Sequence, residues 1–240
     1  MTNRNTSTAH DPPSSTAVEQ FAQLLSLAVH ELRTPASVVG GYLRMLQRDS
    51  DPPLADRQRR MIDEADKSCA RLVALIAELS EVSRLDSGVT TLVREPVDLF
   101  LLVEDVANGV HESSERGVKL EVRGEASGAP LAGDSARLLA AFDAVFRAIL
   151  REQPAACTVI VDRRRSDANS AVIVVAPNDR VQAAYESTPG PFDEKRGGLG
   201  LALPIARRVI ERHDGRIWSP RGVEDRRAAV ISLPLSELKR

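Results

Sequence analysis

Hydrophobic residues recur with helical spacing in the first third of the chain. From Val18 to Leu46 they alternate steps of three and four, at Val18, Phe21, Leu25, Ala28, Leu32, Pro35, Val39, Tyr42 and Leu46. A second series follows at Ile62, Ala65, Cys69, Leu72, Ile76 and Leu79. Spacing of this kind is typical of helices that pack along other helices. The pattern therefore predicts two long amphipathic helices, each with a hydrophobic seam.

Turn-forming residues separate the two predicted helices. Asp49-Ser50-Asp51-Pro52-Pro53 interrupts the first series, and Asp86-Ser87-Gly88 ends the second, with Gly88 suited to the position after a helix. A short connection between long helices predicts an antiparallel hairpin. Because one hairpin cannot bury both seams, we expect two copies to form a homodimeric four-helix bundle.

The pattern changes after Gly88, where strand-like and helix-like segments are mixed. Strands are predicted at Val89–Arg94, Val118–Val122, Cys157–Val161, Ala171–Val175, Arg216–Trp218 and Ala228–Leu233, with a turn at Arg163–Ser170. Helices are predicted at Val97–Arg116, Ser135–Gln153 and Leu199–His213, with Asp134 or Ser135 as the N-cap of the second. The fold class is α+β, a helical hairpin followed by a compact α/β layer domain. The expected division is a disordered tail over 1–16, a helical domain over 17–88 and an α/β domain over 89–240.

Composition excludes several classes of function. The 240 residues carry 32 basic and 34 acidic side chains, a net charge of −2, so nothing global favours nucleic acid or an anionic membrane. The two cysteines, Cys69 and Cys157, form neither a disulfide framework nor a zinc motif. No apolar run reaches the length of a spanning helix, and the N-terminus lacks a signal-peptide pattern. We expect a cytoplasmic protein with no metal site and no membrane insertion.

A histidine on the first predicted helix has chemically suggestive neighbours. His30 lies two residues from Ala28 and two from Leu32, so at about 100° per residue it is turned roughly 200° from the seam. Pro35 lacks an N–H and should bend the helix beside the histidine. Neutral imidazole is a nucleophile near neutral pH, and the adjacent Glu31 could orient it and accept its proton. An ordinary surface histidine on a coiled coil is the alternative.

The segment His30-Glu31-Leu32-Arg33-Thr34-Pro35 resembles the H-box of bacterial two-component sensor histidine kinases. The resemblance continues through the second helix to Ser83-Arg84-Leu85-Asp86-Ser87-Gly88. It implies a dimerisation and phosphotransfer domain, phosphorylation of His30, a general-base role for Glu31, and assistance by Thr34 in dephosphorylating a partner. That partner would be the receiver domain of a response regulator.

The second domain resembles the ATPase-type α/β sandwich of the same family. Gly197-Gly198-Leu199-Gly200-Leu201-Ala202-Leu203, with His213-Asp214-Gly215-Arg216-Ile217-Trp218 after a helix, is similar to the second glycine box. Glycines that open a helix can present N–H groups to phosphate. The resemblance implies phosphate contacts from Gly197, Gly198 and Gly200, to which Arg151, Lys195 and Arg196 could add charge. ATP and Mg²⁺ are then possible cofactors.

Other family positions depart from that pattern. Two asparagines of the nucleotide-box helix, the second a Mg²⁺ ligand, fall on Ala144 and Ala148, and alanine offers no oxygen ligand. The adenine-binding aspartate of the first glycine box falls on Ala176, in Ala176-Pro177-Asn178-Asp179-Arg180, where both glycines are also replaced. The lid segment from Val181 to Arg196 is short, and Arg196 stands in place of the first glycine of the second box. Loss of metal ligand and adenine anchor together should remove most catalysis from ATP.

Three functions remain open at this point. The favoured one is a histidine-kinase-type phosphotransferase that exchanges a phosphoryl group between His30 and a response-regulator aspartate, without autophosphorylation from ATP. The alternatives are a fully active ATP-dependent sensor histidine kinase and a non-enzymatic dimeric scaffold that sequesters regulators. Fewer than thirty residues precede His30. The signal that regulates the protein is therefore expected to arrive through a partner, the N-terminal tail or the second domain. His213 ends a predicted helix, where an imidazolium would be a favourable cap.

Overall fold

The computed structural model describes residues 15–49, 51, 53–111, 114–198, 200–221 and 227–236. The chain divides into two compact units, Met1–Ser87 and Gly88–Arg240. Of the predicted tail, residues 1–14 lie outside the described residues, and the first helix already begins at Ser15. Among the described residues, no helix combines the length and the apolar character needed to cross a membrane.

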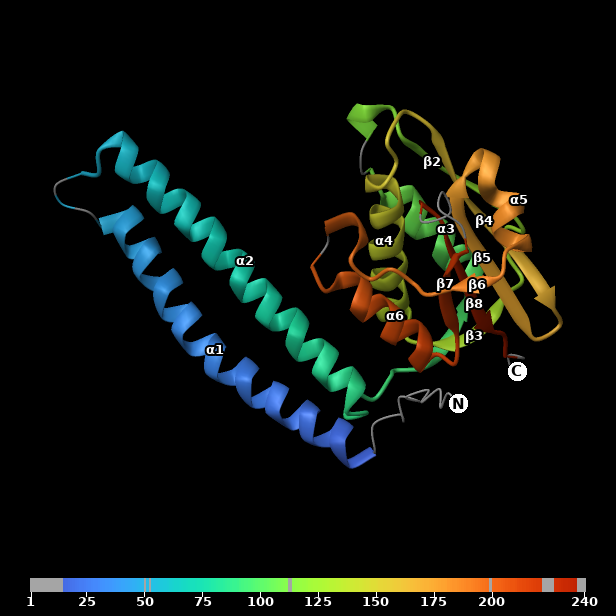
Figure 1. Ribbon diagram of the computed structural model, residues 1–240, viewed down its shortest axis with the longest axis horizontal. Helices are drawn as coiled ribbons and strands as arrows, with labels where there is room; N and C mark the ends of the chain where they lie inside the picture. Colours follow the sequence, from blue (N-terminus) through green and yellow to red (C-terminus); the bar gives the residue numbers. More distant parts are fainter. Residues whose placement is uncertain are drawn as a thin grey trace, which may run out of the picture. The chain divides into compact units, whose positions relative to one another are not determined.

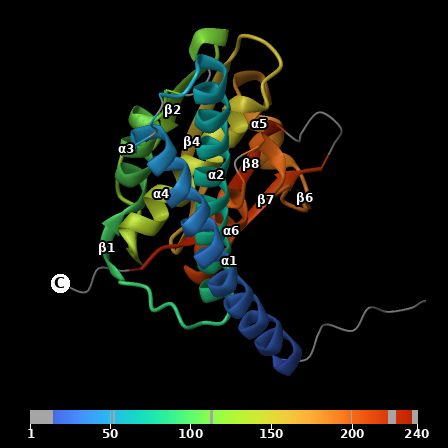
Figure 2. The ribbon, with the colours of Figure 1, turned by 90° about the vertical axis from the view of Figure 1, so that its left-hand side faces the viewer.

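The first unit is the predicted antiparallel hairpin. Helices α1 (Ser15–Asp49) and α2 (Asp56–Asp86) lie side by side along their length (Figures 1 and 2). The Ala55 N–H donates to the Gln58 side chain at 3.0 Å and so satisfies one backbone donor where α2 begins. Gly88 follows α2 with a φ of +71°, the left-handed conformation that glycine adopts readily after a helix.

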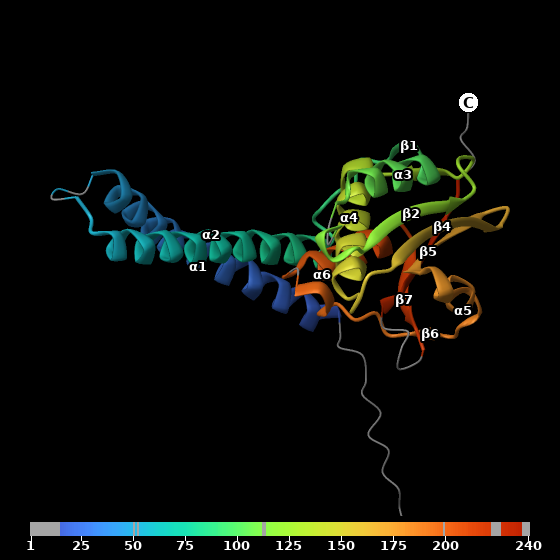
Figure 3. The same ribbon diagram turned by 90° about the horizontal axis from the view of Figure 1, so that it is seen from above.

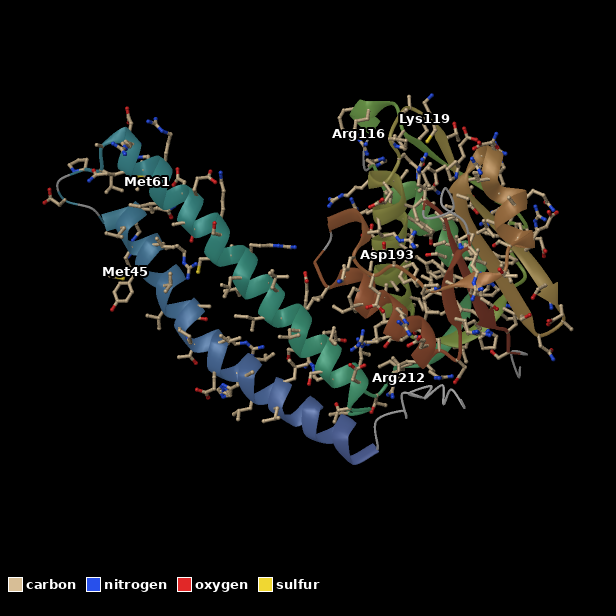
Figure 4. The ribbon with its side chains drawn as sticks, viewed as in Figure 1. Met45, Met61, Arg116, Lys119, Asp193 and Arg212 are labelled. Atoms are coloured by element: carbon tan, nitrogen blue, oxygen red, sulfur yellow. The ribbon has the colours of Figure 1, made fainter. Side chains whose placement is uncertain are left out.

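The hydrophobic seam predicted for α1 does not face α2. The residues of α1 buried in the hairpin are Val29 and Ala36, which pack with Ile76 and Leu79 of α2. Of the large predicted seam residues with described side chains, Leu25 is half-buried and the others are exposed, as are further apolar residues beside them. This exposed set comprises Leu24, Leu27, Leu32, Val38, Val39, Tyr42, Met45 and Leu46. Met45 projects from the side of α1 turned away from α2 (Figure 4). Helix α1 therefore has two apolar stripes, a narrow one against α2 and a broader one that no described residue of the hairpin covers.

The second unit is an α/β layer structure. Its helices are α3 (Leu99–Gly109), α4 (Ser135–Arg151), α5 (Val181–Glu186) and α6 (Ala202–Arg212), with short 3-10 turns at Ser114–Arg116, Asn178–Arg180 and Arg196–Gly198. Its strands are β1 (Glu95–Asp98), β2 (Lys119–Gly124), β3 (Pro130–Gly133), β4 (Thr158–Asp167), β5 (Ser170–Pro177), β6 (Pro189–Gly190), β7 (Arg216–Pro220) and β8 (Ala229–Pro234). Six of the strands form one sheet in the order β2-β4-β5-β8-β7-β6, in which only β2 and β4 pair in parallel; β1 and β3 form a separate pair.

Helices cover both faces of the six-stranded sheet, to very different extents. Helices α3, α4 and α6 lie on one face, and the short α5 lies on the other (Figures 1 and 3). Alternate residues of β5 face opposite sides of the sheet. Val174 and Ala176 face α5 and pack in one hydrophobic cluster with Val181 and Ala184. Phe142 and Phe146 of α4 are fully buried, with ring centroids 5.9 Å apart. The α+β class is confirmed.

Several predicted boundaries were wrong. Val89–Arg94 is not a strand; the chain enters β1 only at Glu95, and β1 pairs with β3, which the sequence pattern did not indicate. The predicted turn Arg163–Ser170 belongs mostly to strands, because β4 continues to Asp167. Its arginines have partners along the strand: Arg163 donates to the Phe100 carbonyl at 2.7 Å and to Glu104 at 2.9 Å. The predicted helix from Val97 is shorter and begins at Leu99, after Asp98 accepts hydrogen bonds as its N-cap.

Candidate functional site

His30 lies on the exposed surface of α1, beside the buried stripe of the hairpin. Its side chain is exposed, as are those of Glu31 and Thr34. The preceding residue, Val29, is only 3% exposed and is packed against α2. The backbone that carries the histidine is thereby fixed by the hairpin core, while the imidazole remains open to an approaching molecule. Thr34 lies four residues after His30, so both side chains occupy neighbouring positions on one helix surface.

Close helix packing supports this part of α1. The Cys69 thiol of α2 donates to the Ala36 carbonyl at 3.2 Å, one residue beyond Pro35. A Cβ atom at Gly40 would lie 3.3 Å from the Cys69 sulfur, so small residues on α1 permit this approach. Helix α1 continues through Pro35 without interruption, and Pro35 leaves the Glu31 carbonyl without the usual backbone donor. Pro35, which was predicted to bend the helix, lies inside α1 and does not end it.

In the second unit, the predicted glycine box lies directly on α4. Gly197 has a φ of +69°, and a Cβ atom there would lie 2.7 Å from the Cα of Ala148 and 2.9 Å from its Cβ. Ala148 is fully buried, and it is the residue on which the ungapped comparison with the family pattern places the metal-binding asparagine. The backbone of Gly197 thus packs closely against Ala148. Neither residue offers a side-chain ligand for Mg²⁺.

Two side chains at the end of α4 hold this glycine in place. The Gly197 N–H donates to the Glu152 carboxylate at 2.9 Å, and the Gly197 carbonyl accepts from the Arg151 guanidinium at 3.2 Å. The N–H that could have faced a phosphate is therefore already used by a carboxylate. Through this hydrogen bond, Arg151 holds the loop against the end of α4. Glu152 was missed by the sequence analysis, because no motif marks it.

Arg196, the residue in place of the first glycine, points into the protein core. It is 5% exposed and donates to the Asp193 and Ala228 carbonyls, each at 3.0 Å, and to the Ser219 hydroxyl. Its guanidinium also lies over the Phe192 ring, 4.9 Å from the centroid. Burial lowers the pKa of Arg196 from its usual value, with Asp193 and Glu152 acting in the opposite direction. Arg196 ties the loop to β7 and to the segment before β8 instead of reaching solvent.

The segment that should form the first glycine box and the lid has another role here. Ala176 is fully buried in the cluster beneath α5. After the turn Asn178–Arg180, α5 packs on the face of the sheet opposite α4 (Figure 3). Tyr185 of α5 is fixed there, because the Arg164 guanidinium stacks 4.2 Å from its ring centroid and its hydroxyl donates to the Asp162 carbonyl at 3.4 Å. The first part of the predicted lid, Val181–Glu186, thus covers the far face of the sheet.

The predicted site residues form two groups, one in each unit. His30, Glu31 and Thr34 lie together on α1, and Gly197 and Arg151 are in contact through the hydrogen bond given above. Gly198 and Gly200 have positive φ angles and are exposed, whereas Leu199 between them lies outside the described residues. Within the described part of the chain, no group of three or more His, Cys, Asp or Glu side chains could hold a metal ion.

His213 is the C-cap residue of α6, as the sequence predicted, but as a buried ring and not as an exposed imidazolium. Its imidazole is 1% exposed, one ring nitrogen, Nε2, accepts from the Asp134 N–H at 2.9 Å, and Nδ1 donates to the Val209 carbonyl at 2.7 Å. Burial lowers the pKa of His213, although the hydrogen bond to Val209 acts in the opposite direction. The ring is therefore a neutral buried connector rather than a charged helix cap.

The chain thus combines a helical hairpin that exposes a histidine with an α/β sandwich. Residues 22–88 match the His Kinase A (phospho-acceptor) domain family. Sensor-like histidine kinase SenX3 of Mycobacterium tuberculosis (strain CDC 1551 / Oshkosh) is 28% identical over 204 residues, which cover 80% of this chain and 49% of SenX3. Residues 22–88 thus belong to the His Kinase A family, and the chain is similar to sensor histidine kinases over most of its length; it spans about half the length of the curated relatives it matches.

Solved structures share the fold. The full-length ShkA structure in complex with AMPPNP has a TM-score of 0.66 at 20% identity, covering 89% of this chain and 45% of ShkA. Histidine kinase ThkA in complex with response regulator protein TrrA has a TM-score of 0.56 at 17% identity, covering 94% of this chain and 65% of that one. Both share the arrangement of a long hairpin followed by an α/β sandwich.

Proposed function

We propose that this chain carries a phosphoryl group on His30 and exchanges it with the aspartate of a response-regulator receiver domain. The observation that carries the proposal is the contrast between the two sites. His30 and its neighbours are exposed on a rigid helix, whereas the glycine loop of the second unit is closed onto α4. The histidine can thus meet a partner, while the nucleotide-type site has the wrong residues for Mg²⁺ and ATP.

The chemistry of the exchange needs few groups from this chain. A neutral His30 ring nitrogen attacks the phosphorus of an aspartyl phosphate. The new N–P bond forms as the P–O bond to the aspartate breaks, and the proton of the other ring nitrogen passes to Glu31. In the reverse direction, the same proton returns and the phosphoryl group leaves on the carboxylate. Thr34, on the same surface, positions a water that can hydrolyse the partner's phosphate.

Three features support the proposal that His30 does not receive its phosphoryl group from ATP. Ala148 supplies no oxygen to a metal, the Gly197 N–H is bonded to Glu152, and Arg196 is buried. Transfer from ATP depends on positioning and metal electrostatics, so loss of the metal ligand alone removes a large part of the rate. The α/β unit then acts as a folded partner-binding unit rather than as an ATPase.

The experiment supplies the purified chain with two phosphoryl donors in parallel. One sample receives radiolabelled ATP with Mg²⁺, and the other receives a phosphorylated receiver domain. We expect acid-labile, base-stable label on His30 only in the second sample, and none in a His30→Ala control. Label from ATP would replace the proposal by an autokinase; absence of label from any cognate receiver would leave only the scaffold function.

A fully active sensor kinase is the second candidate, because a protein of similar fold was solved in complex with AMPPNP. This candidate requires the glycine loop to leave Ala148 when nucleotide binds. Titration with a fluorescent ATP analogue separates the two: micromolar affinity that depends on Mg²⁺ supports the kinase, and its absence supports the phosphotransferase.

The broad apolar stripe of α1 supports homodimerisation. Val39 and Tyr42 are 52% and 64% exposed, and Met61 of α2 adds a further exposed apolar side chain (Figure 4). Burying such side chains contributes about 1.5–3 kcal/mol each. A second copy of the hairpin, packed through this stripe, gives the four-helix bundle that the heptad spacing predicts. Each copy then presents its His30 outside the bundle core.

A further inference from the structure

The segment that connects the hairpin to β1, residues 89–94, is fastened to the α/β unit by a small set of polar contacts. We call this segment the linker. The Val93 N–H donates to the Asp134 carboxylate at 3.2 Å. Arg94 donates to the Arg212 carbonyl at 2.9 Å and to the Asp214 carboxylate at 3.3 Å. The linker is therefore held at two points, the beginning of α4 and the end of α6.

A third contact strengthens the second point. The Arg212 side chain, which lies beside the linker in Figure 4, donates to the Thr90 carbonyl at 2.9 Å. Asp214 follows with a φ of +60°, an unusual conformation for a non-glycine residue, and this turn places its carboxylate next to Arg94. These contacts are polar and partly exposed, so each one is weak by itself.

His213 joins the two points beneath the linker. Its Nε2 accepts the Asp134 N–H, and its Nδ1 donates to the Val209 carbonyl in the last turn of α6. A Cβ atom at Gly133 would lie 3.2 Å from the ring, so β3 packs closely against it. Both ring nitrogens are used by the backbone, and this arrangement requires the neutral tautomer with its proton on Nδ1.

We propose that His213 is a proton-operated joint: its neutral form holds the linker on the α/β unit, and its protonation releases the linker. A proton on Nε2 would face the Asp134 N–H, so two donors would oppose each other and that hydrogen bond would be lost. The imidazolium would then attract the Asp134 carboxylate, which is the acceptor of the Val93 N–H. It would also repel the Arg94 guanidinium. One protonation thus weakens both points that hold the linker.

The charges around the ring act in both directions. Those that surround His213 from its own turn, from the start of α4 and from the linker are Arg212, Asp214, Asp134, Arg137 and Arg94. The two carboxylates favour the imidazolium, and Arg94 opposes it. Burial is the largest influence and lowers the pKa of His213, so the ring is neutral at pH 7 and protonates only below its ordinary value near 6.5. The joint therefore holds at neutral pH and opens in acid.

Release of the linker would lengthen the free tether between the hairpin and the α/β unit by residues 90–94. Transfer between groups carried on separate units depends on the effective concentration that the tether sets. The joint thus makes the connection between the two units of this chain sensitive to proton concentration. This inference does not depend on the phosphotransfer proposal, because the joint can be observed without any phosphoryl donor.

Hydrogen exchange and NMR on the full chain test the joint. The protection of the Val93 amide is measured between about pH 7.5 and about pH 5, corrected for the intrinsic exchange rate, while the His213 imidazole is titrated in the same samples. We expect the protection of the Val93 amide to fall about tenfold or more as the pH is lowered. The midpoint of this fall should coincide with the midpoint of the imidazole titration. Amides of the central strand β5, such as Val174, should keep their protection. His213→Gln places a non-titrating acceptor near Nε2 and should keep Val93 protected throughout.

Each other outcome refutes the joint. Unchanged Val93 protection while His213 titrates would show that the linker does not respond. An equal loss in His213→Gln would assign the response to another group, and loss at Val93 and Val174 together would show unfolding of the whole unit. If His213→Gln does not fold, the coincidence of the two midpoints in the wild-type chain decides the matter. His111→Gln, an exposed histidine of the same unit, is the matched control and should respond as the wild-type chain does.

Discussion

The closed glycine loop makes a sharp prediction for two neighbouring alanine substitutions. Gly197 and Gly198 have nearly the same backbone conformation, with φ of +69° and +62°. A Cβ at position 197 would lie 2.7 Å from the Ala148 backbone, whereas a Cβ at 198 meets nothing within 4 Å. Alanine in the left-handed region costs about 1–2 kcal/mol at either site. Forcing a methyl group against packed backbone costs about 1–3 kcal/mol more, and only at 197.

We therefore expect Gly197→Ala to lower the free energy of unfolding of the α/β unit by about 2–5 kcal/mol and Gly198→Ala by about 1–2 kcal/mol. The effect of alanine on the unfolded chain is the same in both variants and cancels in the comparison. Urea denaturation followed by circular dichroism gives both values. Equal destabilisation would mean that the loop does not rest on Ala148 in solution, and the argument for a closed site would then be lost.

Three further predictions concern other parts of the chain. Glu31→Gln should slow phosphoryl transfer between His30 and a receiver by about 10²–10⁴-fold, because the ring proton loses its acceptor; an unchanged rate in rapid-quench assays would exclude the general base. Val39→Glu should convert the dimer to a monomer in light scattering, whereas the same substitution at the exposed Arg33, off the broad stripe, should not. Arg196→Met should destabilise the α/β unit by about 1–3 kcal/mol, because the Ala228 and Asp193 carbonyls lose their donor; a neutral result in thermal unfolding would contradict the buried role.

The sequence predicted the two helices of the hairpin but did not show which contact each hydrophobic seam serves: Ile76 and Leu79 of the predicted α2 seam face α1, whereas most of the predicted α1 seam does not face α2. In α1, the stripe against α2 contains Ala36 and Gly40, small residues whose size lets the Cys69 side chain approach. The stripe with larger residues, such as Leu32 and Val39, dominates a hydrophobicity pattern and yet is exposed. A helix in a four-helix bundle has two apolar stripes, one for each neighbouring helix. The sequence of one chain does not show which stripe contacts which helix.

In the α/β unit, local patterns predicted α4, α6 and the central strands, because hydrophobic periodicity and the Asp134 cap are local signals. The β1–β3 pair was missed, since it joins residues such as Glu95 and Gly133 that are far apart in the chain. That position 148 is an alanine, which offers no oxygen to a metal, could be read directly. The sequence could not show that the glycine loop rests on Ala148 or that Arg196 is buried. Both features depend on contacts that form only in the folded chain.

The two sites differ in how their residues relate to the fold. At the hairpin, Val29 and Ala36 supply the packing, and His30 adds nothing to it; a scaffold would have no physical need for an exposed histidine beside a carboxylate. At the glycine loop, the departures from the family pattern are themselves structural. Gly197 packs so closely on Ala148 that a methyl group on the glycine would meet the backbone of α4. If the nucleotide site has lost its metal ligand at this position, as we propose, the alanine and the packed glycine belong to the same contact, and that contact does not involve the residues around His30.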